Sequence, residues 1–369
     1  MTAECASVDA PTYQRNTTIQ AHTYTKKEQT MNPVRIGFVG TGWIADWHFD
    51  GIKTRDECTV VGGCDSPDRF DFCKKRCEEW GIRPYARFED MLADETIDAL
   101  YILTPTHLHH NQTLRAIEAG KHVLVEKPVA LSQSDIDDMK LAGAERGIVV
   151  FPAHNFVYRP VVRKAKEILD TGALGTISYA LFRAVHFIPD EASVGWRTSL
   201  SASGGGAMID SGTHLVYQSL HLMGDPARLS AFKAKKHYTK MDSEDICQIS
   251  LQYEDGAIGN IMQSWASGDT SSTEIRIQGD KGNLLISDAL YHNGEKVAEE
   301  ADYGCTFAYT AAAFAKCATE KVEPVSNLDD AAVTLKLIAD AYESAERFCV
   351  TDFDASRKGS PEVLVAGLA

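Results

Sequence analysis

The sequence predicts two domains. An N-terminal α/β domain contains a doubly wound parallel sheet, and a C-terminal α+β domain is built on an open, mostly antiparallel sheet. Three observations carry this prediction: a glycine-rich turn directly after the first β-rich run, alternating strand and helix signals up to about residue 152, and consecutive strand signals in the second half.

Composition restricts the class of protein. The 369 residues include 52 acidic and 37 basic side chains, so the formal net charge is −15. This charge repels nucleic-acid phosphates and anionic lipid, and the longest apolar runs are too short to span a membrane. We therefore expect an ordinary globular protein with neither a nucleic-acid partner nor a membrane partner.

The nine cysteines indicate a reducing compartment. They are scattered and odd in number, and the sequence contains no Cys-x-x-Cys. This pattern favours neither a disulfide framework nor a structural zinc site, so no metal is expected and a cytoplasmic location is predicted. Cys73 and Cys77 lie four residues apart on an expected helix, which we interpret as two reduced thiols.

Domain boundaries follow from composition and pattern. Residues 1–32 contain few large apolar side chains and are expected to be a disordered extension. We predict a dinucleotide-binding domain over 33–152, a substrate-binding and oligomerisation domain over 153–348, and a C-terminal tail over 349–369.

Strand and helix signals alternate in the first half. Strands are expected at 34–39, 58–64, 98–103, 121–125 and 148–152. Helices are expected from about 43 to 54, from Pro67 to Gly81, and in two segments that end at Gly120 and Gly147. This alternation is typical of a parallel sheet with helices on both faces.

The second half has a different pattern. Helices are expected at about 159–171, 207–223 and 329–348, the last with an apolar stripe of core type. Strands are expected at 176–187, 228–238, 246–253, 256–265, 273–279 and 283–288. Short turns between successive strands indicate mostly antiparallel pairing.

The turn after the first strand has the pattern of a dinucleotide-binding site. Gly40 allows the sharp bend, Gly42 lets a pyrophosphate approach the backbone, and Ala45 permits close packing of helix on strand. Asp65 closes the next strand, where its carboxylate can accept hydrogen bonds from the adenosine ribose and repel a 2′-phosphate. NAD is therefore the predicted cofactor, and NADP stays an alternative.

Further polar segments follow other strands of the expected sheet. Thr104-Pro105 with His109 follows the strand at 98–103, and Glu126-Lys127-Pro128 follows the strand at 121–125. Ligands bind at the carboxyl ends of such strands.

In the second half, Asp210 and His214 are four residues apart after Gly204-Gly205-Gly206, which would place them on one helix face. A carboxylate beside an imidazole is a candidate for a general base with its modulator, although a helix cap and a structural histidine would have the same pattern.

Together these motifs resemble those of the glucose-fructose oxidoreductase and inositol dehydrogenase family, also called Gfo/Idh/MocA. The resemblance covers residues 33–348 and includes Trp196-Arg197 between the other elements. It implies a Rossmann domain, a C-terminal sheet that mediates homodimer or homotetramer contacts, and NAD(P)-dependent oxidation of a sugar or cyclic polyol. It also implies catalytic roles for Lys127, Asp210 and His214.

The expected roles of the residues can be stated together. His214 would accept the hydroxyl proton, Lys127 would stabilise the alkoxide, and Asp210 would hold His214 or a neighbouring hydroxyl. The expected cofactor-binding residues are Gly40, Thr41, Gly42, Trp43, Ile44, Asp65, Thr104, Pro105, His109, Glu126 and Lys127. The expected substrate-binding residues are Lys127, Asn155, Arg159, Trp196, Arg197, Asp210 and His214.

Two positions depart from the family pattern. Thr106 stands where Asn is frequent, and Tyr217 stands three residues after His214 where Asp is frequent. The second departure leaves the identity of the substrate open.

Two other functions also remain open: a redox-assisted glycosidase or retained-cofactor oxidoreductase of the same fold, and a redox-silent sensor that binds NAD(P).

Overall fold

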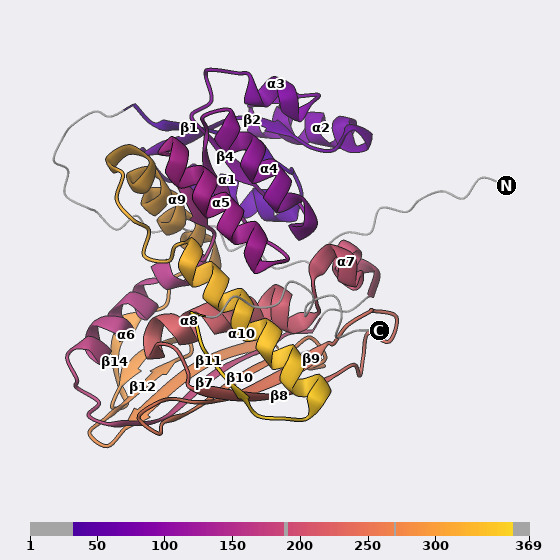
Figure 1. The fold of residues 1–369 in the computed structure, drawn as a ribbon. Helices are drawn as coiled ribbons and strands as arrows, with labels where there is room; N and C mark the ends of the chain where they lie inside the picture. The colour runs from indigo at the N-terminus through magenta and orange to yellow at the C-terminus, as the bar shows by residue number, and fades with distance from the viewer. Residues whose placement is uncertain (1–31, 188–190, 269–270, 357–369) are drawn as a thin grey trace.

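The computed structural model describes residues 32–187, 191–268 and 271–356, with only the backbone at 191–194 (Figure 1). The expected extension at 1–32 lies almost wholly outside these residues, as do residues 357–369 of the expected tail at 349–369. No helix in the described ranges is both long and apolar enough to cross a membrane.

The N-terminal sheet is parallel and has the strand order β3-β2-β1-β4-β5-β6. Its strands are β1 (Val34–Val39), β2 (Cys58–Cys64), β3 (Arg83–Tyr85), β4 (Ala99–Ile102), β5 (His122–Val125) and β6 (Val150–Pro152). Five of these are the predicted strands: β1 and β2 have the predicted bounds, and β4, β5 and β6 are slightly shorter. The sequence analysis did not assign β3, because its three residues include an arginine and a proline, which are poor strand signals.

Helices connect these strands. They are α1 (Trp43–Ile52), η1 (Pro67–Arg69), α2 (Phe70–Trp80), α3 (Phe88–Leu92), η2 (Thr106–Leu108), α4 (His109–Glu118) and α5 (Gln133–Arg146). The predicted ends at Gly81 and Gly147 are confirmed, since both glycines cap their helices with a left-handed backbone. The doubly wound α/β fold is thereby confirmed.

Within the described residues, the second sheet has nine strands and is antiparallel except where β7 pairs with β10. Its strands are β7 (Ile177–Val185), β8 (Arg228–Ala234), β9 (Ile246–Gln252), β10 (Ile258–Ser264), β11 (Ser272–Gly279), β12 (Asn283–Ile286), β13 (Ala289–His292), β14 (Glu295–Glu299) and β15 (Thr351–Asp352). Helices α6 (Pro160–Asp170), α8 (Thr213–Met223) and α10 (Leu328–Arg347) lie on one side of this sheet in Figure 1. The mostly antiparallel second sheet was predicted, whereas β13, β14 and β15 were not.

One helix of the predicted second domain packs against the first domain. Helix α9 (Tyr303–Glu320) follows the second sheet in the chain but packs against α1 of the first domain (Figure 1). Phe314 on α9 shares a buried cluster with Phe38 and Tyr101 of the parallel sheet. The sequence analysis did not assign this helix, because its many alanines do not form a distinct polar and apolar face.

The remaining short helical segments lie between β6 and α8 in the chain. They are η3 (Asn155–Tyr158), η4 (Glu191–Thr198), α7 (Leu200–Ser203) and the π-helical turn η5 (Met208–Gly212). The predicted helix at 207–223 is therefore two segments, η5 and α8.

Candidate active site

The turn between β1 and α1 has the geometry that dinucleotide binding requires. Gly40 has a φ of 97°, and a Cβ there would lie 2.8 Å from the carbonyl oxygen of Leu103. A Cβ at Gly42 would meet no atom within 4 Å, so the space beside this residue is open. Because Gly42 precedes the first turn of α1, this open space adjoins a helix N-terminus, where a pyrophosphate is favoured.

Asp65 lies beside this turn, as the sequence predicted. Its Oδ2 accepts hydrogen bonds from the backbone N–H of Thr41 at 2.9 Å and from the Thr41 hydroxyl at 2.8 Å. Its Oδ1 accepts from the N–H of Ser66 and lies 3.5 Å from Arg69 Nε. The carboxylate therefore orders the glycine turn, and its contact with a ribose stays a prediction.

Two other predicted cofactor residues, Trp43 and Ile44, are the first residues of α1. The Trp43 side chain is 58% exposed, whereas Ile44 is partly buried. Trp43 packs edge-on against Trp47 of the same helix.

His109 connects the two loops at the ends of β4 and β5. Its Nε2 lies 2.7 Å from the carbonyl oxygen of Thr104, and its Nδ1 lies 2.9 Å from that of Pro128. Because both ring nitrogens face carbonyl oxygens, the buried His109 side chain links the loop of Thr104 and Pro105 to that of Lys127. Any effect of His109 on cofactor binding would act through these loops.

A buried hydrogen bond between Glu126 and His48 fixes the loop that carries Lys127. Glu126 Oε1 lies 2.8 Å from Nε2 of His48 on α1, and Glu126 Oε2 accepts the backbone N–H of Lys127 at 3.0 Å. Burial alone would raise the pKa of Glu126, but the hydrogen bond and charge of His48 lower it below its ordinary value. The sequence analysis missed His48, because a single histidine on a helix carries no motif.

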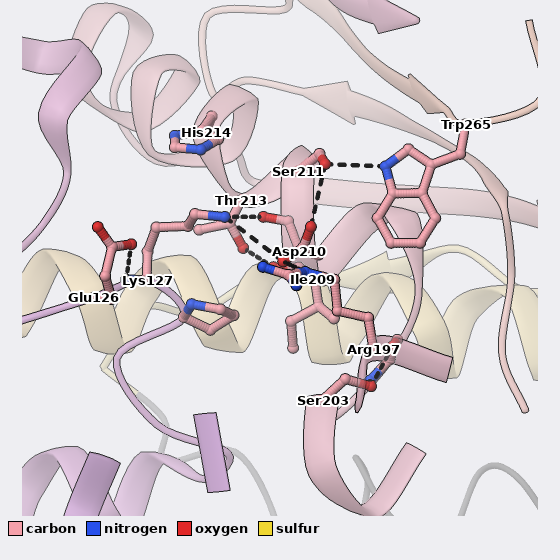
Figure 2. A network of polar contacts seen from close by, with 12 residues as sticks. Glu126, Lys127, Arg197, Ser203, Ile209, Asp210, Ser211, Thr213, His214 and Trp265 are labelled. Atoms are coloured by element: carbon pink, nitrogen blue, oxygen red, sulfur yellow. Dashed lines mark hydrogen bonds and ion pairs between the residues drawn. The ribbon is translucent and has the colours of Figure 1, made fainter. Parts of the chain in front are cut away.

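Lys127 and Asp210 meet across the two domains (Figure 2). Lys127 Nζ donates to the backbone carbonyl oxygen of Asp210 at 2.9 Å and lies 3.7 Å from its Oδ1. Arg197 Nε donates to the same Oδ1 at 3.0 Å. Burial would raise the pKa of Asp210, but the charges of Arg197 and Lys127 hold it well below its ordinary value. The carboxylate is therefore ionised between two cations.

The backbone around Asp210 explains the glycine run that precedes it. A Cβ at Gly206 would lie 1.9 Å from the backbone oxygen of Glu244, and one at Gly205 would lie 2.5 Å from the hydroxyl of Tyr342. The glycines therefore serve close packing. Asp210 itself lies in the π-helical turn η5, whereas His214 lies in α8, so the predicted single α-helical face is wrong in detail. π-helical turns are frequent at functional sites.

His214 has different partners from those predicted. Its ring stacks on Phe156 with centroids 4.4 Å apart, and its Nδ1 lies 2.7 Å from the hydroxyl of Tyr217. Among the described residues, no hydrogen bond joins it to Asp210. Burial and the charge of Lys127 lower the pKa of His214 well below its ordinary value, so the imidazole is neutral. A neutral imidazole beside a lysine can accept a proton.

The predicted substrate residues fall into two groups. Arg197 contacts Asp210, and its guanidinium lies 4.6 Å from the centre of the indole ring of Trp196. Asn155 and Arg159 are buried and have protein partners: Asn155 bonds Tyr217 and Thr306, and Arg159 pairs with Glu300. Because their polar groups already have protein partners, the structure does not favour direct contact of Asn155 or Arg159 with a substrate.

One further histidine near this cluster was missed. His186 directly follows β7, and the pKa of its imidazole is lowered by burial and by Lys127, with Asp210 acting in the opposite direction. No motif marked it, because it lies at the end of an alternating strand.

Comparisons with known proteins identify the family of the chain. Two protein-family models match the chain: the oxidoreductase family with an NAD-binding Rossmann fold at residues 34–154, and the GFO/IDH/MocA C-terminal domain at 162–285. The chain is 30% identical to 1,5-anhydro-D-fructose reductase of Ensifer adhaerens over 255 residues, which are 68% of this chain and 75% of that protein.

Two other relatives match over nearly their whole length. The D-glucoside 3-dehydrogenase of Escherichia coli (strain K12) is 26% identical over 353 residues, 87% of this chain and 98% of that protein. The solved structure of levoglucosan dehydrogenase with NADH and levoglucosan has a TM-score of 0.79 at 21% identity, and the match covers 88% of this chain and 100% of that chain. The likeness to levoglucosan dehydrogenase concerns the fold alone.

Proposed function

Because the chain belongs to the Gfo/Idh/MocA family of oxidoreductases, we propose that it oxidises a secondary hydroxyl of a sugar, glycoside or cyclic polyol. Its N-terminal domain is an NAD-binding Rossmann domain. The open space beside Gly42 at the start of α1 fits the pyrophosphate of such a cofactor.

The observation that carries this proposal is the convergence of Lys127, Asp210 and His214. A cation, an ionised carboxylate and a neutral imidazole come together where the β5 loop of the parallel sheet meets the second domain. Removing hydride from a carbinol carbon requires loss of the hydroxyl proton, and this set contains both a proton acceptor and an alkoxide stabiliser.

The chain's own residues then have distinct tasks. Lys127 Nζ donates to the substrate oxygen and stabilises the negative charge that develops on it. Asp210, held by Arg197, keeps the lysine cation in place through the 3.7 Å ion pair. His214 takes the hydroxyl proton as the carbinol hydrogen leaves with its electron pair. Acceptance of that hydride is the chemistry that bound NAD supplies.

Several finer assignments belong to the same proposal. Asp65 favours NAD, since its carboxylate would repel a 2′-phosphate. Trp196 and Arg197 are the predicted substrate contacts, while Asn155 and Arg159 act by holding neighbouring residues. The eight described cysteines are free thiols, which supports a cytoplasmic enzyme.

We also propose that the protein forms a homodimer or homotetramer through the second sheet. The helices lie on one side of this sheet in Figure 1. Phe232 of β8 is 70% exposed and follows the buried Ala231, so its side chain faces the other side of the sheet. An open sheet face that presents apolar side chains is stabilised when a second copy covers it.

The experiment is a substrate panel with the full-length protein. Sugars, glycosides and inositols are supplied with NAD or NADP, and formation of the reduced cofactor is followed. For each substrate that reacts, His214→Ala and Lys127→Ala are expected to lower turnover by about 10² to 10⁴. Lys140→Ala, which removes an exposed lysine paired with Asp329, is the matched control and should retain turnover.

The outcomes separate the alternatives. Stoichiometric cofactor reduction that depends on His214 and Lys127 supports a dehydrogenase. Cleavage of a glycoside without net cofactor reduction would instead indicate a redox-assisted glycosidase. NAD binding with no reaction on any member of the panel would favour a sensor. Normal turnover in His214→Ala, with folding and NAD affinity intact, would contradict the catalytic assignment.

A further inference from the structure

Behind the catalytic histidine lies a chain of hydrogen bonds whose direction is set at its far end. Thr306, at the start of α9, donates its hydroxyl hydrogen to the carbonyl oxygen of Tyr303 at 2.7 Å. A carbonyl oxygen can only accept, and a hydroxyl has a single hydrogen. The oxygen of Thr306 is therefore left as an acceptor for any other partner.

That acceptor orients the next residue, Asn155. The amide nitrogen of Asn155 donates to Thr306 Oγ1 at 2.9 Å, so its Oδ1 faces the opposite way. Oδ1 accepts the hydroxyl hydrogen of Tyr217 at 3.3 Å. The single hydrogen of the phenol is thereby committed to Asn155.

The phenol oxygen of Tyr217 must then accept from its other neighbours. The backbone N–H of Phe156 donates to it at 3.1 Å, and His214 Nδ1 lies 2.7 Å away. A contact of that length between a ring nitrogen and an oxygen that has already used its hydrogen requires an N–H on Nδ1. Nε2 then carries the lone pair.

We propose that Tyr217, aligned by Asn155, is a positioning residue that holds the proton of His214 on Nδ1 and leaves Nε2 as the acceptor of the substrate proton. This deepens the proposed function and rests on it for the identity of the proton donor. When the substrate O–H bond breaks, the proton goes to Nε2, and the Nδ1–H still donates to Tyr217. The phenol therefore stabilises both charge states of the ring.

Packing supports the same role. Tyr217 is 2% exposed and stacks on the ring of His154 with centroids 4.3 Å apart, while Phe156 covers the face of His214. The phenol is therefore locked in position and reaches no solvent. Tyr217 stands where the family pattern often has Asp, and a phenol whose hydrogen is committed elsewhere can accept from Nδ1 as a carboxylate would.

The first test reads the tautomer directly and requires no substrate. Long-range 1H–15N correlation spectra of the histidine-labelled protein show which ring nitrogen of His214 carries the proton, with His214→Gln used to assign the signal. We expect the Nδ1–H form in the wild type and a shift toward the Nε2–H form in Asn155→Leu, because the phenol hydrogen is then free to turn to Nδ1. A wild-type His214 in the Nε2–H form would overturn the proposal.

The second test is kinetic, on a substrate found in the panel. Tyr217→Phe is expected to lower kcat about 10- to 100-fold, while KM and the Kd for NAD change less than about twofold. Tyr253→Phe is the matched control, since that buried phenol bonds Ser219 of the same helix α8 and should retain wild-type kcat. Unchanged kcat in Tyr217→Phe would contradict the proposal. If no sugar, glycoside or inositol of the panel is oxidised, the proposed function fails, and the tautomer spectra still decide this inference.

Discussion

Replacing His48 with leucine should destabilise the protein and impair catalysis at a distance from the substrate. The His48 imidazole is 1% exposed and lies 2.8 Å from Glu126, whose side chain is 10% exposed. The backbone N–H of Lys127 donates to the other carboxylate oxygen. His48→Leu therefore leaves one buried carboxylate oxygen without its partner and loosens the loop that presents the lysine.

The expected size of the effect follows from these contacts. Leaving a buried carboxylate oxygen without its hydrogen-bond partner typically costs about 3 kcal/mol or more. The cost here is smaller, because Glu126 keeps the hydrogen bond from Lys127 and leucine retains apolar contact with the rings of Tyr101 and Phe307. We expect a loss of about 2 to 3 kcal/mol in the free energy of unfolding, which lowers Tm by roughly 3 to 4 °C for a chain of this length.

The pH dependence of this loss has a definite sign. The pKa of Glu126 is lowered in the folded state, so the ionised carboxylate contributes stability above its unfolded pKa, and this contribution is lost as the pH falls through the folded pKa. Without His48 the pKa of Glu126 rises. The difference in stability between the wild type and His48→Leu should therefore narrow below about pH 4.

Urea unfolding and thermal melts of three variants test this reasoning. His48→Gln keeps a donor toward Glu126 and should recover most of the loss. His110→Leu is the surface control, because its ring is 30% exposed beside Asp135 and Asp138, and it should change stability by less than about 0.5 kcal/mol. Equal stability of His48→Leu and the wild type at neutral pH would refute the assignment of His48 as the partner that holds Glu126.

Three other outcomes are expected. Asp65→Ser should move cofactor preference toward NADP, because it frees Arg69, which lies 3.5 Å from the carboxylate, to bind a 2′-phosphate. Adding Arg69→Ala should abolish this gain in NADP preference, and a gain that persists would show that Arg69 is not its cause. Phe232→Asp should lower the mass measured by light scattering, whereas Phe72→Asp on α2 should not; a monomeric wild type would contradict sheet-mediated assembly. The acid limb of kcat/KM should lie below pH 6.5, because burial and a neighbouring cation lower the pKa of His214; a midpoint above 6.5 would contradict its role as base.

The sequence was sufficient for the parts of the site that depend on local geometry. Gly40 needs a positive φ, and Gly42 leaves open space at a helix N-terminus, so a short motif predicts both correctly. The order of parallel strands then predicts that the loop of Lys127 lies at their carboxyl edge. Alternating apolar residues likewise predicted most strands of the second sheet.

Contacts between distant segments could not be predicted in this way. His48 and Glu126 are 78 residues apart and carry no shared motif, although His48 lies in an expected helix and Glu126 in a motif that the sequence analysis identified. Helix α9 returns to the first domain because its apolar residues, Phe314 among them, complete the core around the parallel sheet. No local pattern states which of two cores such a helix will join.

The tautomer of His214 shows where local reasoning ends and tertiary structure begins. Tyr217 is three residues after His214, and on a helix that spacing alone places the two side chains next to each other. Adjacency does not say which of them carries the hydrogen between them. That is decided by Asn155, 62 residues earlier, and by Thr306, 151 residues after Asn155. A site whose residue types are readable from sequence thus acquires its proton-accepting atom only when three distant segments have packed together.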